Sequence, residues 1–457
     1  MRKAARFAGS KKRRAAGTVR GNFDRGYNAG YNRGYNRGFD AGVSAGRSAF
    51  HAGFEGTSII VPTMNQRELL VRCIESIRLH TPEPHELIVI DNGSSDGTSD
   101  YLRSQTGQLR YKVYQEPLGF AGAVNQGLRM SRGSTVMFLN NDTVVTRNWL
   151  RNMLNCLMAD PDRRLVGPVT NYISGEQKMS ASYSGLEEMH RFAANHNVSD
   201  SSLWVKTGRL TGFCVLMTRG TLERLGFLDE GFEAGNCEDD DYGLRARLLG
   251  IDLVIARDTF IHHEGSVSMN SLGEDRLQRV NEHNMGYFAY KWTQTPALLE
   301  TAVQAAAHRI LQGSDYYPTG VFVEAAGGGT YWLEQGVRHA VTGAELPPVR
   351  LSRMALRRIP RGEDWSLERL RARLAELSKE PGLSHAEAIP EGALAVSPAG
   401  TRYQFSQGTL RIIANACAEE KWGLAQRRAW PISEEQEQAL PRGLPILPPE
   451  IIKAGNL

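Results

Sequence analysis

The stretch Glu86–Thr98 reads ELIVIDNGSSDGT, a short apolar run that ends in an aspartate and passes into a loop rich in glycine and serine. A continuous apolar run of this length is typical of a strand that is buried on both faces of a sheet. The Asn, Gly, Ser and Asp residues that follow are common in turns, because they tolerate or stabilise turn conformations. The segment therefore predicts a buried strand whose carboxyl end carries Asp91.

Similar segments lie on both sides of this strand. Ser58–Val61 (SIIV) and Ser134–Leu139 (STVMFL) are further apolar runs, and Tyr111–Gln115 is a candidate strand between them. Gln66–His80 and Phe120–Met130 have helical periodicity. Strands that alternate with helices predict an α/β, Rossmann-like fold with a mostly parallel sheet covered on both faces.

Polar residues follow three of the predicted strands. Asp91 ends one, Asn140-Asn141-Asp142 follows another, and Pro62-Thr63-Met64-Asn65 follows the first. Because parallel strands point the same way, these residues are expected at one edge of the sheet, where ligands of such folds bind. Carboxylate and amide oxygens suit a hard cation such as Mg²⁺ or Mn²⁺ that also binds substrate phosphates. The pattern predicts a nucleotide site with a metal.

Composition excludes several classes of protein. The 457 residues are 41% hydrophobic and 23% charged, which is ordinary for a globular chain and excludes collagen-like or wholly disordered ones. No apolar run approaches the roughly 18–20 residues that span a bilayer, and the charged N-terminus lacks the apolar stretch of a secretory signal. Five cysteines lie far apart without a CxxC pair. We expect a cytoplasmic protein with reduced thiols.

The first 55 residues form a basic arm with a four-residue repeat. The arm has twelve Lys/Arg and three Asp/Glu, a net charge of +9 in a chain whose total is +4. Glycine recurs at every fourth position from Gly26 to Gly46, followed four times by Tyr or Phe. Glycines disfavour an isolated helix, so the arm is compatible with self-association, with a solvated tail, with a membrane surface or surface layer, or with stacking on RNA. The sequence does not decide between these; we do not expect nucleic acid as the main partner.

The C-terminal third contains an internal repeat with a spacing of 72 residues. The repeated residues are Pro318, Gly320, Tyr331, Gln335 and Gly336, matched by Pro390, Gly392, Tyr403, Gln407 and Gly408. Alternating apolar residues around the glycine turns predict β-hairpins, and Ser366–Lys379 predicts a helix between the copies. Two small β modules of this kind would bind an acceptor polymer or a second subunit, or act as a structural cap.

The segment Thr57–Met269 resembles the family 2 glycosyltransferases of the GT-A fold. The resemblance runs in order through SIIVPTMNQ, ELIVIDNGSSDGT, PLGFAGAVNQGL, VMFLNNDTVV, TGFCVLMTRGTLERLGFLDEGF, EDDDYGLRARLLG and IHHEGSVS, about 210 of the 457 residues. It implies transfer of a sugar from a nucleotide-diphosphate donor to an acceptor hydroxyl with inversion, usually with a divalent cation, Mn²⁺ or Mg²⁺ here. The acceptor implied is a bacterial surface glycan or a glycoprotein.

The resemblance also implies roles for residues of the donor site. The residues expected to bind the nucleotide sugar are Pro62, Thr63, Asn65, Asp91, Gly122, Asn125, Asn140, Asn141 and Arg245. Asn140, Asn141 and Asp142 occupy the position of the family's DxD motif, with Asn140 in place of the first aspartate, as in rhamnosyltransferase-like members. Asp142 and the pair His262 and His263 are expected at the metal, with His263 favoured over His262.

The acid cluster Glu238-Asp239-Asp240-Asp241 is the expected catalytic end of the site. Acids at a helix N-terminus also complement the helix dipole, but the family places an ED-x-D pattern followed by an arginine here. The resemblance makes Asp239 the general base, with Glu238 and Asp241 holding acceptor hydroxyls or Arg245.

The predicted organisation has seven parts. They are the arm at 1–55, the transferase domain at 56–295, a helical linker at 296–316, a β module at 317–365, a linker helix at 366–388, a second β module at 389–445 and a tail at 446–457. Two rival functions remain: a degenerate scaffold of the same fold that binds glycans, and an RNA-associated protein led by the arm. A nucleotidyltransferase is a further rival, although its glycine-rich, basic first loop is missing.

Overall fold

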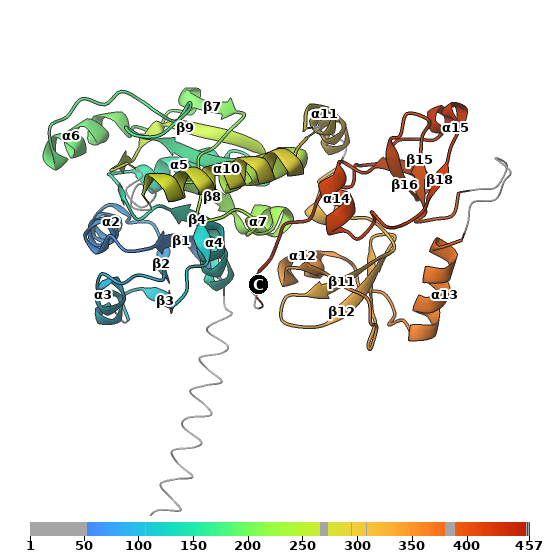
Figure 1. Cartoon of the computed structure of the whole chain (residues 1–457). Helices are drawn as coiled ribbons and strands as arrows, with labels where there is room; N and C mark the ends of the chain where they lie inside the picture. The colour runs from blue at the N-terminus through green and yellow to red at the C-terminus, as the bar shows by residue number, and fades with distance from the viewer. Residues whose placement is uncertain are drawn as a thin grey trace, which may run out of the picture. The chain divides into compact units, whose positions relative to one another are not determined.

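The computed structural model in Figure 1 describes residues 53–105, 107–265, 273–293, 295–307, 309–379, 389–453, 455 and 457. Within it, Glu55–Leu457 form one compact unit. The repeat predicted in the basic arm lies outside the described residues, as does the end of the IHHEGSVS segment. In the part of the chain that is described, no helix combines the length and apolarity that a membrane crossing requires.

An eight-stranded sheet forms the core of the N-terminal two thirds, with strand order β3-β2-β1-β4-β8-β6-β9-β7. Its strands are β1 (Phe54–Thr63), β2 (His85–Asn92), β3 (Arg110–Tyr114), β4 (Gly133–Leu139), β6 (Arg164–Val169), β7 (Trp204–Thr207), β8 (Cys214–Thr218) and β9 (Asp252–Phe260). A short ribbon of β5 (Thr143–Val144) and β10 (His262–His263) lies outside this sheet.

The first half of the sheet is parallel. β1 pairs in parallel with β2, and β2 with β3. β4 runs in the same direction as β1, because hydrogen bonds join Thr57 to Thr135 at the starts of these strands and Thr63 to Asn141 at their ends. β8 is antiparallel to both β4 and β6, whereas β6 and β9 are parallel. The carboxyl ends of β1, β2 and β4 therefore meet at one edge.

Helices cover both faces of the sheet (Figure 1). The helices of this part are α2 (Arg67–His80), α3 (Thr98–Ser104), α4 (Gly119–Met130), α5 (Trp149–Met158), α6 (Leu186–His196), α7 (Arg219–Leu225), α8 (Glu238–Leu248), α10 (Glu274–Lys291) and α11 (Thr295–Ala306), with 3₁₀ turns η1 (Ser201–Leu203) and η2 (Gly313–Tyr316). The predicted strands and the helices α2 and α4 are confirmed. The helix that the sequence places at Leu244–Leu249 begins six residues earlier, at Glu238, so the acid cluster forms its first turn.

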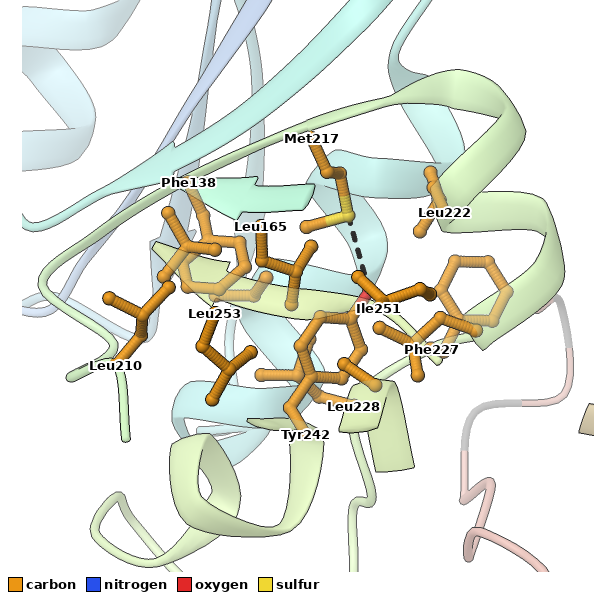
Figure 2. Close-up of a cluster of buried hydrophobic side chains, with 14 of the residues drawn as sticks. Phe138, Leu165, Leu210, Met217, Leu222, Phe227, Leu228, Tyr242, Ile251 and Leu253 are labelled. Atoms are coloured by element: carbon orange, nitrogen blue, oxygen red, sulfur yellow. Dashed lines mark hydrogen bonds between the residues drawn. The ribbon is translucent and has the colours of Figure 1, made fainter. Parts of the chain in front are cut away.

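The two faces of the sheet carry separate hydrophobic clusters. Ile60 of β1 belongs to the cluster with α4 and α8, while its neighbours Ile59 and Val61 belong to the cluster with α2 and α5. This is the alternation of a strand that is buried on both faces. Figure 2 shows part of the first cluster, in which the Tyr242 hydroxyl donates to the Met217 sulfur at 3.4 Å. A Cβ at Gly127 of α4 would lie 2.2 Å from Ile60, so only glycine allows this packing.

Two further sheets have the same strand order and the same strand directions. The first has the order β13-β12-β11-β14 and the second β17-β16-β15-β18, each with two antiparallel pairs and one parallel pair. The elements are β11 (Val321–Ala325), β12 (Thr330–Glu334), β13 (Val337–Ala340), β14 (Val349–Leu351), α12 (Arg353–Arg358), α13 (Leu367–Leu377), β15 (Leu394–Val396), β16 (Arg402–Ser406), β17 (Thr409–Ile412), α14 (Ala416–Lys421), β18 (Ala429–Pro431) and α15 (Glu434–Ala439). Gln335 and Gln407 occupy matching turns, with φ values of 49° and 51°.

These features confirm the predicted fold class. The chain combines a Rossmann-like α/β sheet that is parallel over its first four strands with small β sheets at the C-terminal end. The predicted domain boundaries stay predictions.

Candidate functional site

The predicted donor residues meet where β1, β2 and β4 end. Thr63 is the register partner of Asp91 across the β1–β2 pair. On the other side of β1, the Asn141 amide donates to the Thr63 hydroxyl at 2.9 Å. The parallel sheet thus places the three polar segments side by side, as the sequence predicts.

Asp142 and His263 form a buried pair beside this edge. β5 and β10 pair antiparallel, with Thr143 opposite His263, and the ribbon is extended by a bond from the Glu264 N–H to the Asp142 carbonyl at 2.9 Å. His263 Nε2 lies 3.1 Å from Asp142 Oδ1, and the two side chains are only 2% and 4% exposed. The Phe213 ring stacks on His263 at 5.5 Å and 14° between the planes.

The environment of His263 defines what its Nε2 can do. Its Nδ1 lies 2.7 Å from the Tyr172 carbonyl oxygen, which only accepts, so Nδ1 carries a proton and donates. A neutral His263 would then direct the lone pair of Nε2 at the Asp142 carboxylate. Two electron-rich atoms repel each other at this distance. The contact is favourable if Nε2 carries a second proton or if both atoms bind the same cation. Burial alone would lower the pKa of His263, but the hydrogen bond and charge of Asp142 outweigh burial and raise this pKa above its ordinary value of 6.5.

The structure does not place His262 with Asp142, although the sequence puts it at the metal. Successive residues of a strand point to opposite faces, so only one histidine of the pair can face Asp142. The His262 ring instead contacts the Tyr183 hydroxyl at 2.6 Å through Nδ1, and its Nε2 lies 3.9 Å from Glu264. Burial lowers the pKa of His262.

Asp239 contacts the residue that precedes Phe213. Its carboxylate accepts the Gly212 N–H at 2.8 Å and the Asp240 N–H at 2.9 Å. The next residue, Phe213, accepts the Asn140 N–H at 2.8 Å through its carbonyl and stacks on His263. Gly212 and Phe213 therefore join the acid cluster of α8 to the Asp142–His263 pair. Burial and the neighbouring charge of Asp240 raise the pKa of Asp239.

Two buried oxygens near this segment have no hydrogen-bond partner among the residues that the structure describes. They are Oε2 of Glu238 and Oδ1 of Asn140. Glu238 is only 4% exposed, and burial followed by the charge of Asp239 raises its pKa to about 8. Burial therefore favours the protonated form of Glu238, which can donate a hydrogen bond. Because buried polar atoms are normally paired, these two atoms mark places for ligand groups.

Asp241 and Arg245 are held inside the protein. Asp241 is fully buried, and it contacts Lys291 Nζ at 2.6 Å, Arg245 Nε at 2.8 Å and the Trp292 indole N–H at 3.0 Å. Arg245 also donates to the carbonyls of Leu225 and Phe227. Lys291 and Arg245 lower the pKa of Asp241, although burial opposes them. The structure thus places these predicted site residues in a buried network that anchors α8, without a free group toward a substrate.

Asp91 and Asn65 connect two loops at the edge of the sheet. The Asp91 carboxylate, which is fully buried, accepts the Ser94 N–H at 2.9 Å and the Ser99 hydroxyl at 2.5 Å. Asn65 has a left-handed backbone with φ of 59°; its N–H donates to Ser94 Oγ at 2.7 Å and its side-chain oxygen accepts the Ser95 N–H at 2.8 Å. These contacts shape the loops that follow β1 and β2.

The other predicted donor residues belong to the scaffold of the site. Pro62 is buried in β1 opposite Ile90. Asn125 is fully buried, and its side chain bonds both backbone groups of Leu228. A Cβ at Gly122 would lie 2.9 Å from the Leu118 side chain. These residues position α4 against the sheet.

Sequence reasoning missed three residues that shape the site. Arg209 forms an ion pair with Asp240, Tyr172 accepts from His263 through its carbonyl, and Lys291 holds Asp241. Arg209 lies three residues before Gly212, so its position in the sequence could have indicated that it lies near the site. Lys291 lies fifty residues after Asp241, and no local pattern links them.

Residues 58–226 match the family described as Glycosyl transferase family 2. This stretch of the chain is therefore similar to the members of that family. The matched range includes Asp142 and Phe213 but ends before the acid cluster and His263, so the grouping of those residues rests on the geometry above.

Curated relatives of the chain include named glycan enzymes. The validoxylamine A glucosyltransferase of Streptomyces hygroscopicus subsp. limoneus is 26% identical over 296 residues, which cover 56% of this chain and 65% of that protein. The chondroitin synthase of Pasteurella multocida is 28% identical over 222 residues, which cover 42% of this chain and 23% of that protein. The chain thus spans less than two thirds of either relative. A solved mannosyltransferase from Pyrobaculum calidifontis, in complex with GDP-Man and Mn²⁺, is 20% identical with a TM-score of 0.36, covering 56% of this chain and 76% of that one.

Lys291→Met should destabilise the protein by about 3–5 kcal/mol, because removal of one partner from a buried ion pair leaves the other charge uncompensated. Lys291 lies 2.5 Å from Asp229 and 2.6 Å from Asp241, and all three side chains are fully buried. Urea denaturation followed by circular dichroism measures the loss.

Lys206→Met is the matched control. Lys206 is 72% exposed and pairs with Asp252 at 2.6 Å, and exposed pairs contribute about 0–1 kcal/mol. Equal midpoints for the two variants would contradict an anchoring role for Lys291.

Proposed function

We propose that this protein is an inverting glycosyltransferase that moves a sugar from a nucleotide-diphosphate donor to a hydroxyl of a glycan or glycoprotein acceptor. One observation carries the proposal: the Asp239 carboxylate accepts the Gly212 N–H, and His263, the partner of Asp142, stacks on the next residue, Phe213. A general base and an anion-stabilising centre are the two components that such a transfer needs. The family 2 match and the glycan enzymes among the relatives support the same activity.

The residues present fit a divalent cation. His263 donates its Nδ1 proton to a backbone carbonyl, as metal-bound histidines usually do, and its Nε2 faces a carboxylate oxygen. Asp142 and His263 would hold the ion, Mn²⁺ or Mg²⁺. No third His, Cys, Asp or Glu completes a cluster among the described residues, so water and the donor diphosphate would supply the other ligands. When bound, the cation would offset the charge that develops on the leaving diphosphate.

Asp239 is suited to the general base role. Asp239 is half-buried, and the N–H groups of Gly212 and Asp240 hold the orientation of its carboxylate. In the proposed reaction Asp239 takes the proton of the acceptor hydroxyl while that oxygen bonds the anomeric carbon. The bond between the anomeric carbon and the diphosphate oxygen breaks on the opposite face, and the electron pair leaves with the nucleoside diphosphate.

Glu238 and Asn140 would contact substrate hydroxyl groups. Their buried oxygens lack partners within the described part of the chain, and a protonated Glu238 can donate to a sugar oxygen. We assign Asp241 and Arg245 a positioning role, since both are bound within the protein. Thr63, Asn65, Asp91 and Asn141 would shape the nucleoside end of the site, with Pro62, Gly122 and Asn125 behind them.

The wider setting of the reaction is part of the proposal. We place the enzyme in the bacterial cytoplasm or at a membrane or surface-layer periphery. The acceptor would be a cell-surface polysaccharide or a glycosylated protein. The arm at 1–55 would serve self-association, and the two C-terminal β modules, 317–365 and 389–445, would bind an acceptor or a subunit.

Purified protein with Mn²⁺ should release nucleoside diphosphate from at least one member of a panel of UDP-, GDP- and dTDP-sugars. Asp239→Asn should lower this rate roughly 100- to 10,000-fold, because general-base catalysis contributes about that much, while leaving nucleotide binding intact. A coupled nucleoside-diphosphate assay and calorimetry measure the two.

Asp252→Asn, a change in a surface ion pair, is the control and should keep the wild-type rate. Silence of the wild-type protein across the whole panel, together with glycan binding but no nucleotide binding, would instead support a degenerate glycan-binding scaffold.

His263→Gln should weaken Mn²⁺ binding by at least tenfold, whereas His262→Gln should leave it unchanged, because only His263 faces Asp142. Calorimetric titration of Mn²⁺ in the presence of the preferred nucleoside diphosphate measures both. Equal losses in the two variants would remove His263 from the metal site.

The rate should fall with decreasing pH around the pKa of Asp239, since the base must be ionised. This pKa is raised, so the acidic limb of kcat/KM should lie above the ordinary aspartate value of 3.8. Asp240→Asn removes a negative neighbour and should move the limb to lower pH. If the acidic limb of the pH profile does not move in Asp240→Asn, then ionisation of Asp239 is not what the limb reports.

A further inference from the structure

A hollow lies beside the acid cluster, and none of the proposed donor or metal contacts line it. It has a volume of about 210 Å³ and is formed by two loops. The lining residues are Ser174, Gly175, Glu176, Gln177, Thr207, Gly208, Arg209 and Thr211. We propose that this hollow is the acceptor subsite and that it binds a hydroxyl-rich sugar ring. The proposal rests on the proposed function and names the substrate class of the same site.

The wall of the hollow contacts the acid cluster that carries the proposed base. Arg209 pairs with Asp240 on one side and donates to the Ser174 hydroxyl at 3.2 Å on the other. Thr211, in the wall, is followed by Gly212, whose N–H holds the Asp239 carboxylate at 2.8 Å. The wall residue Thr211 is therefore next in sequence to the residue that holds the proposed base.

The walls of the hollow are fixed before any ligand binds. Gln177 is 2% exposed; its side chain accepts the Thr211 N–H at 2.7 Å and donates to the Pro168 carbonyl at 2.9 Å. The backbone of the same loop returns onto Thr170, whose N–H bonds the Gln177 carbonyl at 2.9 Å. Gln177 thus joins the two loops to the end of β6. A pre-formed site loses less conformational entropy on binding.

The chemistry of the walls selects the ligand class. None of the eight described residues that line the hollow is hydrophobic or aromatic, which disfavours a lipid chain or an aromatic acceptor. The lining residues carry three hydroxyls and one carboxylate, while the Gln177 amide and the Arg209 guanidinium are bonded within the protein and hold the walls. Donors and acceptors of both charge signs in one small space suit a neutral group with many hydroxyls. The volume corresponds to roughly seven water molecules, which a single sugar ring would displace.

Gly208 offers a way to fill the hollow. A Cβ at this position would meet no atom within 4 Å, so a large side chain can be added without a backbone clash. Gly185, at the start of α6, is equally open and lies outside the hollow. Gly208→Phe and Gly185→Phe are therefore a matched pair.

The test measures binding of methyl glycosides of glucose, galactose and N-acetylglucosamine to the full-length protein by saturation-transfer NMR, with UDP, GDP or dTDP and Mn²⁺ present. Wild type and Gly185→Phe should bind at least one glycoside, and Gly208→Phe should bind it at least tenfold more weakly. Nucleoside-diphosphate binding should be equal in all three. Glu176→Ala, which removes a wall carboxylate without filling space, should also weaken glycoside binding.

Two results would overturn the inference: no glycoside binds the wild-type protein, or Gly208→Phe binds it as the control does. Thermal denaturation shows that each variant is folded. The donor panel tests the proposed transferase activity separately. Glycoside binding that depends on Gly208 would therefore support a sugar-binding hollow even if the panel showed no activity.

Discussion

The Lys291 ammonium group lies between two fully buried carboxylates, those of Asp229 and Asp241, and the position of the acid cluster depends on this contact. Removing three charges from water is costly unless they compensate one another. Asp241 is in the first turn of α8, two residues after Asp239, so the ion pair fixes the start of the helix that carries the proposed base. Burial favours the neutral amine, but the two carboxylates outweigh it and raise the pKa of Lys291.

The C-terminal end of the chain completes this network. The Ile451 N–H donates to Asp229 at 3.1 Å, the Ile451 carbonyl accepts from Glu230, and the Lys453 N–H donates to the Glu230 carboxylate at 2.6 Å. Glu230 in turn accepts from Asn125 of α4 at 3.0 Å. Asn415 contacts the Lys291 carbonyl at 2.7 Å, and Arg358 pairs with Glu223. The C-terminal sheets and tail therefore support the two helices, α4 and α8, that flank the site.

The sequence predicts the parts of the fold that depend on local pattern. Apolar runs located β1, β2 and β4, and the residues that follow them met at one edge because the direction of parallel strands determines that meeting. The sequence favoured His263 but kept His262 at the metal as well, since the final choice depends on which face of β10 turns toward β5. Local pattern could not show that Asp241 belongs to a buried network, because its partner Lys291 comes from a distant helix. Which acids of the cluster are exposed depends on where α8 begins. The helix begins at Glu238, six residues before the start that periodicity predicts.

The proposed metal site has few protein ligands, and this has a thermodynamic consequence. One oxygen of Asp142 and one imidazole nitrogen of His263 face each other and would be its two protein ligands. A divalent ion prefers about six ligands, so most must come from water or from diphosphate oxygens. The ion would then gain much of its affinity from the nucleotide, and by linkage the nucleotide would gain the same factor from the ion. Metal and donor would therefore bind cooperatively, each raising the affinity of Asp142, His263 and the surrounding site for the other.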